Sequence, residues 1–242
     1  MASNSAENFR FERIEKKFRI NTQQYEALLP VLRAHTHPDA HGSSRIRNVY
    51  YDTPDYYLIR RSIERPKFKE KLRLRCYGDF AEEAPVFVEV KRKLDGIVYK
   101  RRLTLPYSKA KLLLSGQPAG SQDPQVEREM LAFVKRYPIE PVVDLAYERE
   151  ALYDNEDPDL RITLDRNLRF RLYTEEAAGA PTADMQPVLE DPAEMILEIK
   201  ALKGIPPWLL FVLEENKIYQ APFSKIGTCY TRHIAGLGPK HS

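Results

Sequence analysis

The sequence has few of the residues that bind metals through sulfur or that close disulfides. Its 242 residues include two cysteines, Cys76 and Cys229. They do not have the short spacing of a metal motif, and no histidine or cysteine pair has zinc-site spacing. The two thiols could form one disulfide, but a reduced pair in the cytosol is the favoured interpretation.

Long apolar runs and nucleotide-binding loops are also missing. No run approaches the roughly 18 apolar residues that a membrane-spanning helix requires. The N-terminal stretch MASNSAENFRFERIEKKF lacks the apolar segment of a signal peptide. There is no Walker A motif and no glycine-rich dinucleotide loop. These absences predict a cytoplasmic protein that does not span a membrane, although a membrane protein could still be its partner.

The composition is that of an ordinary globular chain with an unusual share of charge. Hydrophobic residues make up 43% and charged residues 30%, while the net charge is only +3. A total this small does not indicate nucleic-acid binding, so no nucleic-acid partner is expected. We expect a single domain over residues 1–242, with flexible tails at 1–8 and 237–242.

Period-two alternation predicts strands over most of the chain, and apolar stripes predict helices between them. Strands are expected at 9–20, the stretch IRNVYYDT, 68–77, 85–93, 97–105, 142–152, 160–172 and 194–202. Helices are expected at 21–32, 108–115, 124–136 and 207–219. The fold class is therefore α+β, with an antiparallel eight-stranded β-barrel surrounded by helices.

The stretch EKLRLRCYG at residues 70–78 has an apolar face and a basic face. Leu72, Leu74 and Cys76 alternate with three cations. We expect the three apolar residues to pack against covering helices. Like charges in a row on one sheet face repel each other. The strand therefore needs something anionic opposite its cations, or open solvent.

Several other predicted strands also carry mostly basic residues on one face. Each face alone could simply be solvated, because lysine and arginine normally lie in water. As a set, the faces favour a concave basic surface that binds phosphate groups. The few carboxylates among them are candidates for holding a divalent cation.

Other conspicuous residues have simpler interpretations. The segment 35–44 contains His35, His37 and His41 and is interpreted as a polar loop, with metal binding as the lesser alternative. Tyr50 and Tyr51 could stack a base, but packing is favoured. Residues 175–190 are rich in alanine, glycine, proline and acids and are expected to form a mobile loop.

Nine short motifs in this order resemble the catalytic domain of VTC-type polyphosphate polymerases, in the CYTH or triphosphate tunnel metalloenzyme superfamily. They are RIEKKF, YYDT, KLRLRCYG, FVEVKRK, YKRRL, YEREAL, RITLD, LEIKALKGIPPWL and FSKIG. The resemblance covers Arg13 to Gly227 and implies an eight-stranded tunnel whose lumen binds triphosphate or polyphosphate.

The strand faces and this resemblance together assign the candidate site. Expected catalytic residues are Lys17, Arg73, Arg75, Lys91, Lys100, Arg149 and Arg161. Expected phosphate contacts are Arg13, Lys71, Lys93, Arg102, Lys200, Ser224 and Lys225. The metal, Mn²⁺ or Mg²⁺, would be held by Glu198, with Glu15 and Glu89 as further candidates.

The resemblance implies a metal-dependent phosphotransferase that moves the γ-phosphate of ATP onto a phosphate or polyphosphate chain. Triphosphatase and cyclase members typically begin with Glu-x-Glu-x-Lys, whereas this chain has Arg13, Glu15 and Lys17 in that register. Replacing an acid by a base favours the polymerase branch. The alternatives are a tripolyphosphatase or nucleoside triphosphatase, a non-catalytic polyphosphate-binding module, and RNA binding through the basic surface.

Overall fold

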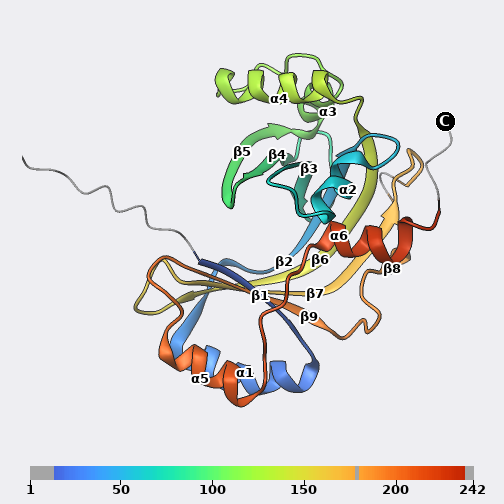
Figure 1. Ribbon diagram of the computed structural model, residues 1–242. Helices are drawn as coiled ribbons and strands as arrows, with labels where there is room; N and C mark the ends of the chain where they lie inside the picture. Colours follow the sequence, from blue (N-terminus) through green and yellow to red (C-terminus); the bar gives the residue numbers. More distant parts are fainter. Residues whose placement is uncertain (1–13, 178–179, 238–242) are drawn as a thin grey trace, which may run out of the picture. The chain divides into compact units, whose positions relative to one another are not determined.

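The computed structural model describes residues 14–177 and 180–237 (Figure 1). The elements in chain order are β1 (Ile14–Ile20), α1 (Thr22–His35), β2 (Thr36–Asp52), α2 (Tyr57–Ile63), β3 (Phe68–Tyr77), β4 (Pro85–Leu94), β5 (Ile97–Pro106), α3 (Tyr107–Leu114), α4 (Pro124–Arg136), β6 (Glu140–Asp154), β7 (Arg161–Leu172), the 3-10 turn η1 (Thr182–Asp184), β8 (Gln186–Pro187), β9 (Met195–Ala201), α5 (Pro207–Glu215), α6 (Lys225–Cys229) and the π-helix η2 (Tyr230–Ile234). Arg13 lies outside the described residues, as do residues 1–8 and 238–242.

The strands follow one another in the order β1-β9-β7-β6-β2-β3-β4-β5, and β8 pairs with β7. The pairings whose register is defined are all antiparallel. The predicted α+β class with an eight-stranded antiparallel sheet is confirmed. Antiparallel pairing matters for function because directly opposite residues present their side chains on the same face.

Contacts between residues group the chain into two compact units. The β1 unit comprises Met1–Ser43, Glu150–Asp165 and Ala193–Pro222, and the β3 unit comprises Ser44–Arg149, Arg166–Pro192 and Phe223–Ser242. Strands β2, β6 and β7 contribute residues to both units.

The β1 unit has its own apolar core. Asn21 begins α1 with a capping box, in which its side chain accepts from the Gln24 backbone N–H and Gln24 reaches back to the Asn21 N–H. Leu28 and Leu32 of α1 pack with Leu213 of α5 and with the apolar face of β1 and β9. Figure 1 shows α1 and α5 beside these strands. Glu15, Lys17 and Arg19 of β1 and Glu198 and Lys200 of β9 are left on the other strand face.

The β3 unit buries the apolar face of β3 under α3 and α4. Leu72, Leu74 and Cys76 lie in one cluster with Leu113 of α3 and Phe133 of α4, which confirms the packing expected from the alternation. Each such buried leucine contributes about 1.5–3 kcal/mol relative to exposure. This burial determines which face of β3 lies against the helices. The basic residues that alternate with Leu72, Leu74 and Cys76 therefore point to the opposite face.

Two local expectations were wrong. Residues 36–44, expected as a polar loop, form the first part of β2, and the expected loop at 175–190 contains η1 and β8. Both cysteines are free and buried. Among the described helices, none has the length and apolar character needed to cross a bilayer.

Candidate functional site

The β3 unit carries rows of charged side chains across β3, β4 and β5. The antiparallel register places Arg73, Glu89 and Arg102 directly opposite one another on the three strands. The next row toward the β4–β5 turn consists of three lysines, Lys71, Lys91 and Lys100. The row after that begins with Lys69 opposite Lys93. Because paired residues share a face, these side chains form one basic surface.

Glu89 lies at the centre of this surface and is 2% exposed. Its Oε2 accepts from Arg73 at 2.7 Å, and its Oε1 accepts from Arg102 at 2.7 Å. Lys100 Nζ lies 2.6 Å from Oε1, and Arg75 Nε lies 3.9 Å from Oε2. One buried carboxylate is therefore shared by four cations, which leaves a local excess of positive charge.

The pKa shifts follow from this arrangement. Burial raises the pKa of the Glu89 carboxyl, but the charges of Arg73 and Arg75 outweigh burial and hold it well below its usual range. Burial lowers the pKa of Lys100, and the hydrogen bond to Glu89 opposes that shift. Glu89 is thus a permanent anion near neutral pH, and it organises the cations around it.

Neutral side chains of β2 and β6 orient the arginines, and the sequence interpretation missed them. Arg75 donates to Asn48 Oδ1 at 3.0 Å and to the Tyr147 hydroxyl at 3.2 Å. Tyr50, directly opposite Arg73 in the register, hydrogen-bonds to its side chain. The available signal was the alternation of Asn48 and Tyr50 with Val49, which places both on the same strand face as these arginines.

The C-terminal motif contributes two more predicted residues to the β3 unit. Lys71 Nζ donates to Ser224 Oγ at 3.0 Å, and the same oxygen accepts from the Gly227 N–H as the N-cap of α6. Lys225 and Arg149 each lie over the Tyr147 ring, at 4.6 Å and 5.3 Å from its centroid. The structure therefore brings Ser224 to Lys71, and Lys225 to the same tyrosine as Arg149.

The β1 unit carries the remaining predicted residues that the structure describes. The register places Lys17 opposite Glu198 and Glu15 opposite Lys200. Within this face, Lys17 Nζ lies 3.4 Å from Glu15 Oε1, and Lys200 Nζ lies 2.7 Å from Glu198 Oε1. Arg161 of β7 is opposite Lys200 and pairs with Asp39 at 3.5 Å. Here acids and bases alternate, in contrast to the β3 unit.

Two buried polar atoms on this face have no hydrogen-bond partner. They are Arg161 Nε and the hydroxyl oxygen of Thr163, and Thr163 lies directly opposite Glu198. Buried polar groups usually find partners, so these two atoms are available to a ligand, an ion or a water molecule. The sequence interpretation did not include Thr163, because a threonine in a strand carries no distinctive signal.

The donor set around Glu198 fits a hard divalent cation. Glu198 and Glu15 supply carboxylate oxygens from diagonal positions on β9 and β1, and Thr163 adds an orphaned hydroxyl. Mg²⁺ and Mn²⁺ are commonly held by one or two carboxylates together with substrate phosphates. No cluster of three or more acidic, histidine or cysteine side chains occurs among the described residues, so the ion would need ligands from the substrate. Glu89 fits a metal poorly, since both its oxygens are occupied by cations.

The histidine-rich segment does not form a metal centre among the described side chains. His35 stacks on Trp208 with ring centroids 4.5 Å apart. His37 Nδ1 lies 2.9 Å from Asn155 Oδ1. Both histidines therefore have structural partners.

Comparison with known proteins gives one family and a fold likeness. The model of the VTC domain family matches residues 12–233. A candidate adenylate cyclase from Bacillus halodurans superposes with a TM-score of 0.53 at 17% identity, over 88% of this chain and 93% of that chain. A candidate adenylyl cyclase from Hippeastrum, described as having a dominant triphosphatase activity, gives a TM-score of 0.55 at 15% identity, over 91% and 96%. No curated protein matches the sequence.

Proposed function

Because the chain belongs to the VTC domain family, we propose that it is a metal-dependent phosphotransferase that moves the γ-phosphate of ATP onto a phosphate or polyphosphate chain. The observation that carries this proposal is the basic surface of β3, β4 and β5, where four cations surround one buried carboxylate. Such an excess of fixed positive charge suits several linked phosphoryl groups better than a single carboxylate or sulfate.

The cations of the β3 unit bind and orient the triphosphate. Arg73 and Arg102 present guanidinium groups already fixed by Glu89, so little side-chain freedom is lost on binding. Lys100 adds a more mobile charge, which is 43% exposed. In phosphoryl transfer the enzyme contributes mainly positioning and charge neutralisation. No protein nucleophile is required.

The transfer itself exchanges one phosphate linkage for another. An oxygen of the acceptor phosphate forms a bond to the γ-phosphorus while the bond from that phosphorus to the bridging oxygen of ADP breaks. Positive charge fixed near these oxygens stabilises the charge that spreads over them in the transition state. Because the products again contain a phosphate chain end, the same surface can serve the next cycle.

Glu198 would hold the divalent ion, with Glu15 beside it, and Thr163 is placed to contribute its hydroxyl. When bound, Mn²⁺ or Mg²⁺ supplies positive charge that neutralises phosphoryl oxygens. Lys17 and Lys200 pair with these carboxylates and orient them.

Hydrolysis of a triphosphate is the second candidate function. It is favoured by the triphosphatase activity described for the Hippeastrum protein, with which this chain shares its fold. The first sequence motif argues for the polymerase, because Arg13 stands where hydrolytic members of the superfamily typically have an acid. We further propose a cytoplasmic location, with which the two free buried thiols agree.

Product analysis tests the proposal directly. The purified protein is incubated with ATP, a short polyphosphate primer and Mn²⁺ or Mg²⁺, and the products are sized on a gel. Growth of the primer with release of ADP supports the polymerase. Release of orthophosphate alone supports the hydrolase, and tight binding without turnover under every metal supports a binding module.

A further inference from the structure

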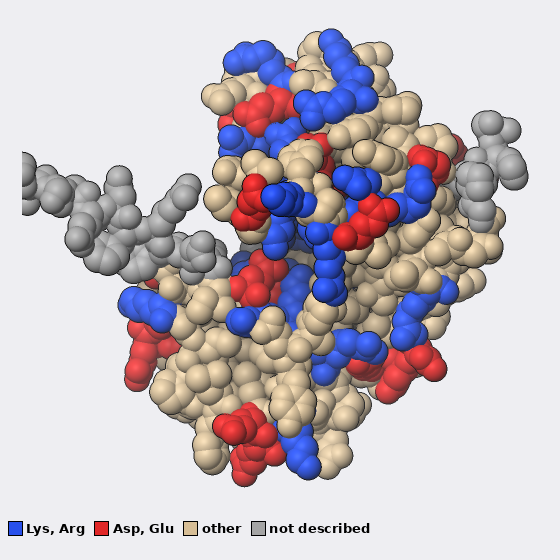
Figure 2. All heavy atoms as spheres, viewed as in Figure 1, with Lys and Arg blue, Asp and Glu red and all other residues tan. Residues whose placement is uncertain are grey.

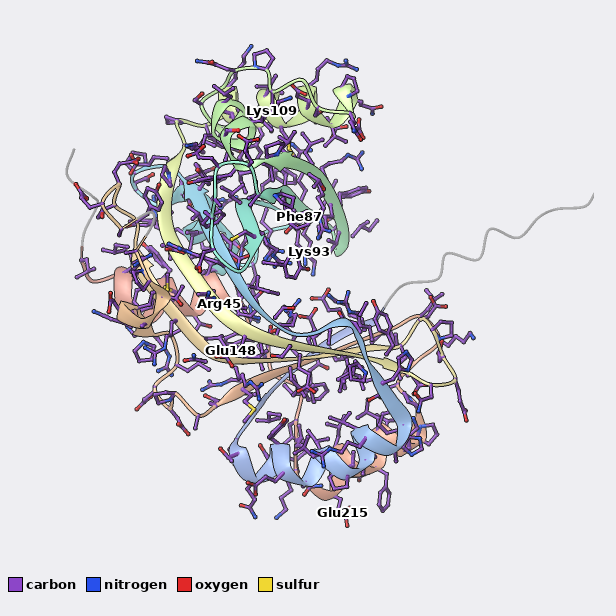
Figure 3. All side chains as sticks on the ribbon, turned by 180° about the vertical axis from the view of Figure 1, so that it is seen from behind. Arg45, Phe87, Lys93, Lys109, Glu148 and Glu215 are labelled. Carbon is purple, nitrogen blue, oxygen red and sulfur yellow. The ribbon has the colours of Figure 1, made fainter. Side chains whose placement is uncertain are left out.

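A second basic site lies at the end of the basic surface, beside the β4–β5 turn. A cavity of about 460 Å³ is lined by Arg65, Pro66, Lys67, Lys69, Lys93, Asp95 and Gly96. We call it the turn cavity. A backbone hydrogen bond of 3.0 Å from Asp95 N–H to the Lys67 carbonyl joins the turn to the segment before β3. Figure 3 labels Lys93, which is one of the residues that line this cavity, and Phe87 nearer the start of the same strand.

The basic residues of the turn cavity outnumber its one acid, Asp95, and form no ion pair within the part of the chain that is described. None of Arg65, Lys67, Lys69 and Lys93 has an ion-pair partner there, although Lys69 donates to the Ser62 carbonyl at 3.2 Å. Other basic residues of the same strands are paired. Arg92 binds Glu70 at 2.6 Å, and Arg101 binds Glu129 at 2.9 Å. Figure 2 shows acidic and basic side chains side by side over the β3 unit.

The geometry of the strands makes the repulsion in this cavity unavoidable. Lys69 lies directly opposite Lys93, and like charges directly opposite each other destabilise a strand pair. Burial, followed by the charges of Lys93 and Arg65, lowers the pKa of Lys69. The cavity lining has four bases and one acid, Asp95, and an excess of positive charge of this size is typical of a site that binds an anion.

The turn cavity continues the surface described above. Lys69, Lys71, Arg73 and Arg75 occupy alternate positions of β3 and therefore lie along one face. Alternate residues of a strand are about 6.8 Å apart, so the line from Lys69 to Arg75 extends about 20 Å. A triphosphate bound at Arg73 and Arg102 would cover only part of this length.

We propose that the turn cavity binds the distal phosphates of a long linear polyphosphate whose end lies at Arg73 and Arg102. This inference rests on the proposed function, since it takes the triphosphate site as given. It adds Arg65, Lys67 and Lys69 to the binding residues and makes chain length a determinant of affinity. Single-stranded nucleic acid is the less favoured ligand, because no aromatic ring lines the cavity to stack a base.

The test compares a short and a long ligand on two matched variants. The first combines Arg65→Gln, Lys67→Gln and Lys69→Gln. The control combines Arg128→Gln, Lys109→Gln and Lys135→Gln, which removes the same three charges from exposed positions of α3 and α4. Affinities for tripolyphosphate and for long-chain polyphosphate are measured by calorimetry at several salt concentrations, after thermal melts confirm folding.

The first variant should lose about tenfold or more in affinity for the long chain, and its salt slope should fall by about 2, as for three lost contacts to a single-stranded polyanion. Its affinity for tripolyphosphate should change less than about twofold, and the control should bind both ligands like the native protein. If the first variant is unstable, the single reversals Lys67→Glu and Lys109→Glu are compared in the same way.

Three outcomes would contradict the inference. Equal losses in both variants would show a general charge effect. A native protein that binds both ligands equally well would show that the turn cavity adds nothing. Single-stranded RNA that displaces the long chain, and does so less well from the first variant, would assign the cavity to nucleic acid. A native protein that does not bind tripolyphosphate at all would instead overturn the proposed function.

Discussion

The β1 unit and the β3 unit both carry charged strand faces, but they mix the two signs differently. In the β1 unit Lys17 of β1 and Lys200 of β9 each have a carboxylate partner, through the pairs Lys17–Glu15 and Lys200–Glu198. In the β3 unit the single carboxylate of Glu89 is shared by four cations. The same strand alternation therefore produces two different electrostatic environments.

This difference teaches what each region can bind. A face whose carboxylates pair with lysines offers oxygen ligands that a divalent cation can take in place of a lysine. A face with one acid among many bases can bind polyanions, and it keeps its bases oriented in their absence. The following predictions are ordered from the largest expected effect to the smallest.

Glu198→Gln should remove the carboxylate that we propose as the metal ligand of the β1 unit. We expect turnover to fall by about a hundredfold or more, which corresponds to roughly 3 kcal/mol in the barrier. Metal-free binding of tripolyphosphate should change little, since the β3 unit supplies that affinity. Activity is measured against Mn²⁺ concentration, and Glu214→Gln on α5 is the control. Unchanged metal dependence would break the assignment of the metal to this unit.

Arg73→Ala should cut tripolyphosphate affinity by roughly ten- to a hundredfold, the size of one or two charge-assisted contacts. Folding should be nearly intact because Glu89 keeps Lys100 and Arg102 as partners. The control is Arg92→Ala, which removes an arginine paired with Glu70. Calorimetric titration measures the loss of binding free energy, and thermal melts measure the loss of stability. A loss of stability as large as the loss of binding free energy would show that Arg73 has a structural role.

Glu89→Gln should leave four cations without their anion. Breaking a buried ion pair on one side costs about 3–5 kcal/mol, so the free energy of unfolding should fall by roughly that amount. Tripolyphosphate binding should become steeper in its salt dependence, because the ligand now replaces the missing charge. Denaturant unfolding with and without ligand measures both effects, and equal stability would contradict the counter-ion role.

The same substitution has a defined dependence on pH. The pKa of Glu89 is lower in the folded protein than the ordinary glutamate value of about 4.3. Its contribution to stability is therefore complete above about pH 4.3 and is lost as the pH falls below that value toward the folded pKa. The native protein should lose more stability than Glu89→Gln between neutral pH and strong acid, as chemical unfolding across that range would show.

Thr163→Val should have the smallest effect on the fold. The hydroxyl oxygen is buried without a partner, so a valine of the same shape should leave stability unchanged or raise it by about 1 kcal/mol. If the hydroxyl faces a bound metal or phosphate, turnover should still fall several-fold. A variant that gains stability and keeps full activity would remove Thr163 from the site.

The fold followed from the sequence where alternation was strong. Strands β3, β4 and β5 and helices α3 and α4 were predicted within a few residues, because apolar side chains at period two or at helical spacing leave few alternatives. The first part of β2 was missed. Residues 36–44 are polar and have no alternation, so only pairing with a neighbouring strand could make them extended.

The candidate site also has features that the sequence predicts and features that it does not. That Arg73 and Arg75 would share a face was fixed by their spacing alone. The spacing did not show that Asn48, Tyr50 and Tyr147 orient these two arginines. These three residues belong to other strands, and only the strand pairing brings them to the arginines.

The sequence by itself determined which residues alternate, and hence the α+β class, the strands and the basic character of one face of each. The tertiary structure decided how those faces combine: one acid among four bases at Glu89, paired signs at Glu198, and an excess of basic residues over acid at the turn cavity. The physical reason is that alternation is local, whereas electrostatic balance depends on which strands lie opposite one another and in what register.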